Sequence, residues 1–348
     1  MEQEIQAWKI TEFNLEGQIN LNNKFGLIKI YRSDDGVLAM TGDANYGRID
    51  QEKPSPATFL RSDSILGFVL DIGIQREKML TYGQGHYFGI QLTQVQSKRP
   101  VSQRDFNPDT FEKIGNLINT YYQSGDKQKE AEAIKMQLLF DTYNDARLLF
   151  PTFYAESYLN LMRIIDAIGH ARGGYDFATF VASLSTDLNN SIYAKLKALK
   201  AYKGRLDVAI NLFNDCLKKA NPKKWPCSKE MEKYNDSEKV IFACFYSAYQ
   251  YRNKFVHIGF PFPDTVKESL GLGEGSGTAY LNPALGISWS KVHRPDGLQE
   301  GDLIDVHKIV GAEADDFKNK YFQLLPSWYF LKSMTREALL KKVETPMS

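Results

Sequence analysis

The spacing of hydrophobic and polar residues along the chain changes character near residue 100. Before that point, short runs of β-forming residues, such as 8–13 and 27–31, are separated by turn signals such as Ser33-Asp34-Asp35-Gly36. We expect further strands at 65–74 and 87–95. The pattern predicts about five to seven short strands in this region, which is sufficient for a small sandwich or barrel.

Beyond residue 100 the pattern is that of helices, because apolar residues recur at helical spacing and strong helix formers become frequent. Asn107 can cap the first of these helices, and Asp236 or Ser237 can cap a later and more aromatic one. We predict helices at 107–122, 127–149, 153–168, 191–219, 236–257, 312–321 and 327–342.

These two regions predict an α+β protein with a small all-β domain at residues 1–105 and an all-α helical bundle at residues 106–348. The chain has 348 residues, of which 43% are hydrophobic and 24% are charged, as in ordinary globular proteins. Its formal net charge is +1, so there is no overall basic field. A nucleic acid would therefore have to be bound by a local patch.

The cysteines and the termini bear on the compartment and on metals. Cys216, Cys227 and Cys244 form no CxxC pair and no Cys/His cluster, so we expect no structural zinc and no other metal or cofactor. A sparse, odd cysteine count suits a reducing cytosol. The chain shows neither a signal-peptide pattern nor an apolar stretch that approaches the ~18–20 residues of a membrane helix. We expect a cytoplasmic protein without membrane contact.

The candidate chemistry lies at the end of the aromatic helix predicted at 236–257. Residues 252–257 read Arg-Asn-Lys-Phe-Val-His, and Gly259 follows shortly after. An arginine is a permanent cation that binds phosphate oxygens, and a histidine can transfer a proton near neutral pH. Arg252 and His257 are therefore sufficient in kind to cleave RNA without a metal ion.

On an ideal helix, Arg252 and His257 do not point to the same place. Counting 100° per residue from Ile241, Arg252 lies about 20° from the centre of an apolar face, whereas Asn253 and His257 share a more polar face. Two arrangements would bring them together. The helix ends near Val256 and turns His257 round, or two copies of the chain face each other and share one site.

A guanidinium on an apolar face needs a charged partner or a ligand. Asp166, in the preceding helix, is a candidate partner for Arg252. Asp166 can equally form a surface ion pair with Arg163 or His170, at helical spacings of three and four. Tyr249 can stack on an RNA base or pack inside the bundle. The sequence leaves both pairs of alternatives open.

Residues from about 127 to 335 resemble a HEPN domain, and most closely the ApeA-like branch of that family. The resemblance rests on two segments. The first is the helix at 158–169, which has an acidic residue in an apolar stripe. The second is 249–257, which ends in Arg, a polar residue, three intervening residues and His, with a glycine after it. Such a resemblance implies a helical bundle that commonly forms homodimers.

The active members of the HEPN family are metal-independent endoribonucleases, in which motifs of two protomers meet in one cleft. The resemblance makes Arg252 and His257 the catalytic pair and Asn253 the polar residue that assists them. We add Asp166 and Tyr249 as supporting residues. The 2′-hydroxyl of the RNA would attack the adjacent phosphorus, which leaves a 2′,3′-cyclic phosphate and a 5′-hydroxyl.

We expect a toxin or an effector of anti-phage defence. The partners are RNA, with tRNA among the candidates, a second copy of the chain, and a regulatory partner or the N-terminal domain as a sensor. The alternative is a HEPN-like module that binds RNA or a nucleotide, or mediates assembly, without cutting. A metal-dependent hydrolase has little support, because the five histidines are scattered and no HExxH motif is present.

Overall fold

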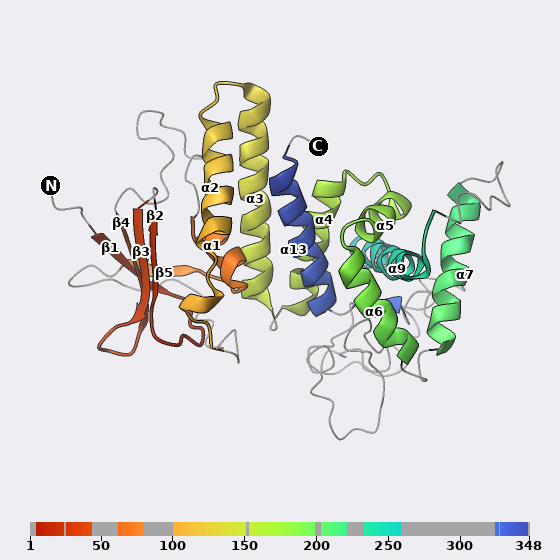
Figure 1. Ribbon diagram of the computed structural model, residues 1–348, viewed down its shortest axis with the longest axis horizontal. Helices are drawn as coiled ribbons and strands as arrows, with labels where there is room; N and C mark the ends of the chain where they lie inside the picture. The colour runs from red at the N-terminus through yellow and green to blue at the C-terminus, as the bar shows by residue number, and fades with distance from the viewer. Residues whose placement is uncertain are drawn as a thin grey trace, which may run out of the picture. The chain divides into compact units, whose positions relative to one another are not determined.

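The computed structural model describes residues 5–23, 26–43, 62–79, 100–150, 153–198, 203–220, 233–258, 324–326 and 328–346. The chain divides into two compact units, residues 1–153 with 345–348 and residues 154–344. The first unit combines a β-sheet with helices, and the second is helical, so the chain is an α+β protein as predicted. Figure 1 shows the elements of each unit. The predicted strand at 87–95 and the predicted helix at 312–321 lie outside the described residues.

The first unit is built on a five-stranded sheet of order β2-β3-β4-β1-β5, in which each neighbouring pair is antiparallel. The strands are β1 (Ile5–Ile10), β2 (Ile19–Asn23), β3 (Gly26–Arg32), β4 (Leu38–Asp43) and β5 (Arg76–Met79). Alternate residues face the core: Ile19 pairs with Ile30 and Leu21 with Ile28, and all four are buried. The predicted turn between β3 and β4 is present, with Gly36 in the left-handed region that favours glycine.

The helices of this unit are α1 (Ser62–Leu70), α2 (Pro108–Tyr122) and α3 (Lys127–Leu149), with a short 3₁₀ helix η1 (Gln103–Asp105). The bounds of α2 and α3 confirm the prediction. Asn107 caps α2 by accepting a hydrogen bond from the Thr110 amide, and Asp126 caps α3 through the amides of Gln128 and Lys129.

The strand predicted at 65–74 is wrong, because residues 62–70 form α1. Its apolar side chains are buried, so the run shows no polar face from which a helical period could be read. A short apolar run of this kind fits a buried strand and a buried helix equally well. Gly67 lies so close to α3 that a Cβ there would be 2.6 Å from the Asn144 Oδ1 atom.

The two compact units meet in sequence at 153/154 and not at the predicted 105/106. The physical reason is that α1 packs against both α2 and α3. The buried faces of these two helices therefore belong to the core of the N-terminal unit, although helical character begins near residue 107.

The second unit is arranged around α9 (Asp236–Ile258), against which α5 (Gly174–Ala182), α6 (Thr186–Ala198) and α7 (Lys203–Ala220) pack. In addition, α4 (Tyr154–Gly169) packs on α5 and on α13 (Trp328–Glu344). The bounds of α4 and α13 agree with the prediction within two residues at each end.

Two helices of this unit differ from the prediction. The single helix predicted at 191–219 is two, α6 and α7, each of which buries residues against α9; residues 199–202 lie outside the description. The helix α5 was not predicted, because Gly173 and Gly174 suggested a chain break. Its buried residues, Phe177, Ala178, Val181 and Ala182, nevertheless recur at helical spacing.

Candidate functional site

The helix α9 carries the Arg-Asn-x3-His segment and is fixed at its beginning by a capping box. The amide of Glu238 donates to the Asn235 side chain at 3.0 Å, and the Asn235 amide donates to the Glu238 carboxylate at 2.8 Å. The cap is therefore Asn235, one residue before the predicted Asp236. Residues 240–245 are fully buried, so this part of α9 is covered on all sides.

Directly before Arg252, Tyr251 is completely buried, and burial raises the pKa of its phenol well above the usual range. Tyr251 is therefore a neutral core residue. Tyr249 packs its ring on Phe177 of α5, with 5.4 Å between the ring centroids. Two roles were predicted for Tyr249, stacking on an RNA base and packing inside the bundle. The contact with Phe177 is packing inside the bundle.

The guanidinium of Arg252 meets the carboxylate of Asp166 across the gap between α9 and α4. The Nη2 atom of Arg252 lies 3.5 Å from the Asp166 Oδ2 atom, and the two side chains are 26% and 24% exposed. Arg252 also lies over the ring of Tyr249, at 5.3 Å from its centroid. Asp166 is therefore paired with Arg252, the first of the two predicted alternatives. Arg163, a candidate in the second alternative, donates to the Asn160 side chain.

The Arg252–Asp166 pair does not use the full hydrogen-bonding capacity of the carboxylate. A well-formed bond between a guanidinium and a carboxylate is about 2.7–2.9 Å long, which is shorter than the 3.5 Å separation found here. The Oδ1 atom of Asp166 is buried and accepts no hydrogen bond from the described residues. Burial raises the pKa of Asp166, and the opposing effect of Arg252 is smaller.

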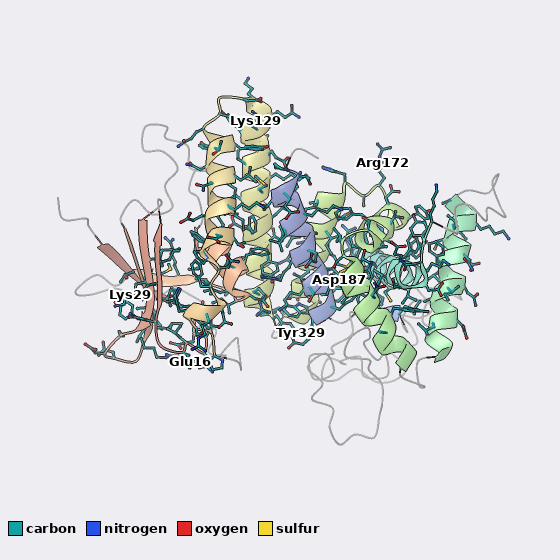
Figure 2. The ribbon with its side chains drawn as sticks, in the orientation of Figure 1. Glu16, Lys29, Lys129, Arg172, Asp187 and Tyr329 are labelled. Carbon is teal, nitrogen blue, oxygen red and sulfur yellow. The ribbon has the colours of Figure 1, made fainter. Side chains whose placement is uncertain are left out.

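Close helix packing makes the contact possible. A Cβ on Gly169 at the end of α4 would lie 2.7 Å from the Phe180 ring, and a Cβ on Gly174 would lie 3.0 Å from the Tyr249 ring. Because these two positions have no side chain, α5 lies close to both α4 and α9. The loop between them carries Arg172, whose side chain points away from the helices (Figure 2). Arg252 therefore points into the bundle, whereas Arg172 points into solvent.

His257 remains part of α9, because the helix continues to Ile258. The predicted arrangement in which the helix ends near Val256 and turns His257 round is therefore wrong. His257 is exposed, Val256 is 54% exposed, and Asn253 is half-buried. On a regular helix, Arg252 and His257 are about 140° apart around the axis and about 7.5 Å apart along it. Within one chain, the helix thus separates the two groups.

The glycine contacts are the part of this site that the sequence interpretation missed. Gly169 and Gly174 are not among the residues predicted for the site. The available signal was the Gly173-Gly174 pair, because a glycine beside a helical segment also marks a close approach of backbones. Gly259, which follows the motif, lies outside the described residues.

No protein-family model, curated protein or solved structure matches this chain. In the part of the chain that the structure describes, no three His, Cys, Asp or Glu side chains are grouped so that they could bind a metal ion. Among the helices in the same described ranges, none is long and apolar enough to cross a membrane.

Proposed function

We propose that this protein is a metal-independent endoribonuclease that acts as a toxin or in anti-phage defence. The observation that carries the proposal is the half-buried Arg252, held between Asp166 and Tyr249 five residues before an exposed His257. The resemblance of 249–257 to the HEPN signature supports the same conclusion. A cation with a fixed position and a solvent-accessible proton carrier are the two groups that RNA cleavage needs.

In the proposed reaction, the 2′-hydroxyl of the RNA is the nucleophile. A histidine takes its proton, the oxygen attacks the adjacent phosphorus, and the bond to the 5′-oxygen breaks as that oxygen receives a proton. Arg252 stabilises the negative charge that develops on the phosphate oxygens, and Asn253 assists by hydrogen bonding. The products are a 2′,3′-cyclic phosphate and a 5′-hydroxyl, and a 2′-deoxy substrate is not cut.

The active unit of this proposal is a homodimer. Because α9 separates Arg252 from His257 by about 140°, Arg252 of one copy acts with His257 of the other. The exposed last turn of α9, with Val256 and His257, is the surface through which the second copy completes the site. The wider partners in the proposal are RNA, tRNA included, and a regulator that keeps basal cleavage low.

The test is an RNA cleavage assay in EDTA with wild type, Arg252→Ala and His257→Ala. Two exposed residues of the same unit provide matched controls, Arg163→Ala for the arginine and His170→Ala for the histidine. We expect wild type and both controls to cut RNA and leave cyclic-phosphate ends, and both site variants to be inactive. Cleavage retained in both site variants would overturn the proposal.

Mixing the two inactive variants tests the shared site. A mixed dimer of Arg252→Ala and His257→Ala contains one site with both an arginine and a histidine, so mixing should restore part of the activity. A site contained within one chain would give no recovery. RNA binding without cleavage in every variant and in wild type would instead favour the non-cutting HEPN-like module.

A further inference from the structure

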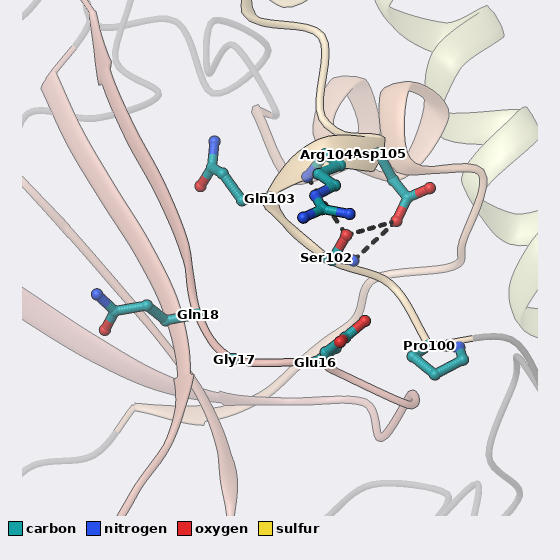
Figure 3. Close-up of a pocket in the computed structure, with 8 residues that line it drawn as sticks. All are labelled: Glu16, Gly17, Gln18, Pro100, Ser102, Gln103, Arg104 and Asp105. Atoms are coloured by element: carbon teal, nitrogen blue, oxygen red, sulfur yellow. Dashed lines mark hydrogen bonds between the residues drawn. The ribbon is translucent and has the colours of Figure 1, made fainter.

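Polar and charged side chains of the N-terminal unit surround a surface pocket of about 440 Å³ (Figure 3). One side of the pocket is formed by residues 16–18, which lead into β2. The other side is formed by residues 102–105, which contain η1. A volume of this size is typical of sites for small molecules.

The two sides of the pocket are held in place by short hydrogen bonds. The Glu16 amide donates to the Val101 carbonyl at 2.8 Å, and the Val101 amide donates to the Asn14 carbonyl at 2.7 Å. The Asp105 carboxylate accepts hydrogen bonds from the amide and the hydroxyl of Ser102, at 2.9 and 3.0 Å. These bonds form the pocket without a ligand and engage the negative charge of Asp105 within its wall.

Glu16 and Arg104 remain as two opposite charges on opposite sides of the pocket. Both are exposed, and neither forms an ion pair with a residue in the described ranges. Figure 3 shows the Arg104 guanidinium beside Ser102 on one side and the Glu16 side chain on the other. An acceptor and a fork of donors therefore face the same space.

We propose that this pocket binds a guanine nucleotide. Guanine is a flat fused ring with two N–H donor groups, on N1 and N2, on its Watson–Crick edge and two acceptors, O6 and N7, on the adjoining Hoogsteen edge. The Glu16 carboxylate accepts from the donor edge and the Arg104 guanidinium donates to O6 and N7, each through two parallel bonds. Adenine presents an unprotonated ring nitrogen toward the carboxylate and an amino group toward the arginine, so it does not fit.

Two glutamines provide the contacts for the sugar and the phosphate. The Gln103 side-chain oxygen already accepts a hydrogen bond from the Asn20 amide at 2.7 Å, which leaves its amino group as a donor. Gln18 also lines the pocket and offers both a donor and an acceptor. The site is independent of the proposed RNA cleavage and gives the N-terminal unit a ligand of its own.

The experiment is isothermal titration calorimetry of the full-length chain with GMP, AMP, IMP and 7-deaza-GMP. IMP lacks the exocyclic amino group that Glu16 would bind, and 7-deaza-GMP lacks the N7 acceptor of Arg104. We expect GMP to bind most tightly, IMP and 7-deaza-GMP to bind at least about tenfold more weakly, and AMP not to bind, because each analogue leaves a charged group unpaired.

Glu16→Gln and Arg104→Gln should each weaken GMP binding at least about tenfold. Lys127→Gln, at an exposed position of the same unit, is the control and should leave binding unchanged. Because both pocket residues are exposed, the variants should fold, which circular dichroism checks. Equal binding of GMP and AMP, GMP binding that survives both pocket variants, or no binding of GMP would overturn the proposal. None of these results bears on RNA cleavage.

Discussion

The two units of the molecule each contain an arginine paired with an aspartate from a distant part of the chain, and the two pairs differ in how completely they are satisfied. In the N-terminal unit, Arg147 is 9% exposed and donates to the Asp71 backbone carbonyl at 2.6 Å, while Tyr143 donates to the Asp71 carboxylate at 2.6 Å. In the helical unit, Arg252 and Asp166 meet at 3.5 Å, the same separation as between the Arg147 Nε and Asp71 Oδ1 atoms, but no side-chain hydrogen bond supplements this contact within the described residues.

The difference shows that the same two residue types can have different roles. The Arg147 pair joins α3 to the loop after α1 through several bonds, so its role is structural. Within the described residues, the Arg252 pair leaves the Asp166 Oδ1 atom without a hydrogen-bond partner, and the Arg252 side chain is 26% exposed. Arg252 therefore has donors left for an anion, as the proposed contact with a phosphate requires.

The largest expected effect is on catalysis by Arg252→Ala. We expect kcat for RNA cleavage to fall by about 10²–10³, because a fixed group that stabilises the developing charge is lost. The free energy of unfolding should change by less than about 1 kcal/mol, since the pair is partly exposed and weakly bonded. Urea denaturation and single-turnover cleavage measure the two quantities. If Arg252→Ala lowered the free energy of unfolding by as much as it raised the activation free energy of cleavage, the Arg252 pair would be structural like the Arg147 pair.

Arg147→Ala should show the reverse behaviour. We expect a loss of about 1–3 kcal/mol in the free energy of unfolding, because the Arg147 side chain is only 9% exposed and the Asp71 carbonyl loses its donor. The cleavage rate per folded molecule should stay within a factor of about two, because this pair belongs to the other unit. A large loss of activity in well-folded Arg147→Ala would contradict a purely structural role.

A smaller effect is expected in the pH dependence of stability, through Asp166. Burial raises the pKa of Asp166 in the folded state, so the folded protein holds the proton more tightly than the unfolded chain does. Stability should therefore fall as the pH rises from about 4, the usual pKa of an aspartate, through the raised pKa.

Asp166→Asn should lose this part of the slope, and urea denaturation between pH 4 and 7 gives the difference from wild type. Asp63→Asn is unsuitable as a control because it is also buried, whereas Asp109→Asn lies on the surface. A slope that is unchanged in Asp166→Asn would mean that another group titrates in this range.

The smallest expected effect comes from Gly174→Ala. The new Cβ would lie 3.0 Å from the Tyr249 ring and 3.1 Å from the end of the Gln250 side chain, so Tyr249 and the Arg252 above it must shift slightly. We expect a loss of a few-fold in cleavage, and a change in stability within about 1 kcal/mol because alanine favours the helix. Gly173→Ala is the matched control, since its Cβ would meet nothing within 4 Å.

The sequence predicted the elements whose ends carry their own signals. The cap Asn107 placed the start of α2 correctly, because a side chain that binds the first amides acts locally, and the strong helix formers of 127–149 placed α3. It was wrong for α1, where burial on all sides removes the periodic pattern. For the site, the apolar surroundings of Arg252 predicted a charged partner.

The remaining features of the site depend on distances between helices, which no local pattern contains. The choice between Arg252 and a surface partner for Asp166 was settled by the close approach that Gly169 and Gly174 allow. The unpartnered Oδ1 atom of Asp166 likewise results from packing alone. Gly259 did not indicate where α9 ends relative to His257, because the helix continues to Ile258.

The hydrogen bond from the Asn20 amide to the Gln103 side chain has a consequence for how the N-terminal sheet ends. Among the described strands, β2 lies at one edge of the sheet, and such an edge can recruit a strand from another molecule and begin aggregation. Gln103 occupies the outward amide of Asn20, so an incoming strand would have to displace it before pairing could start. A single glutamine on a short 3₁₀ helix thus protects this chain against uncontrolled association through its sheet.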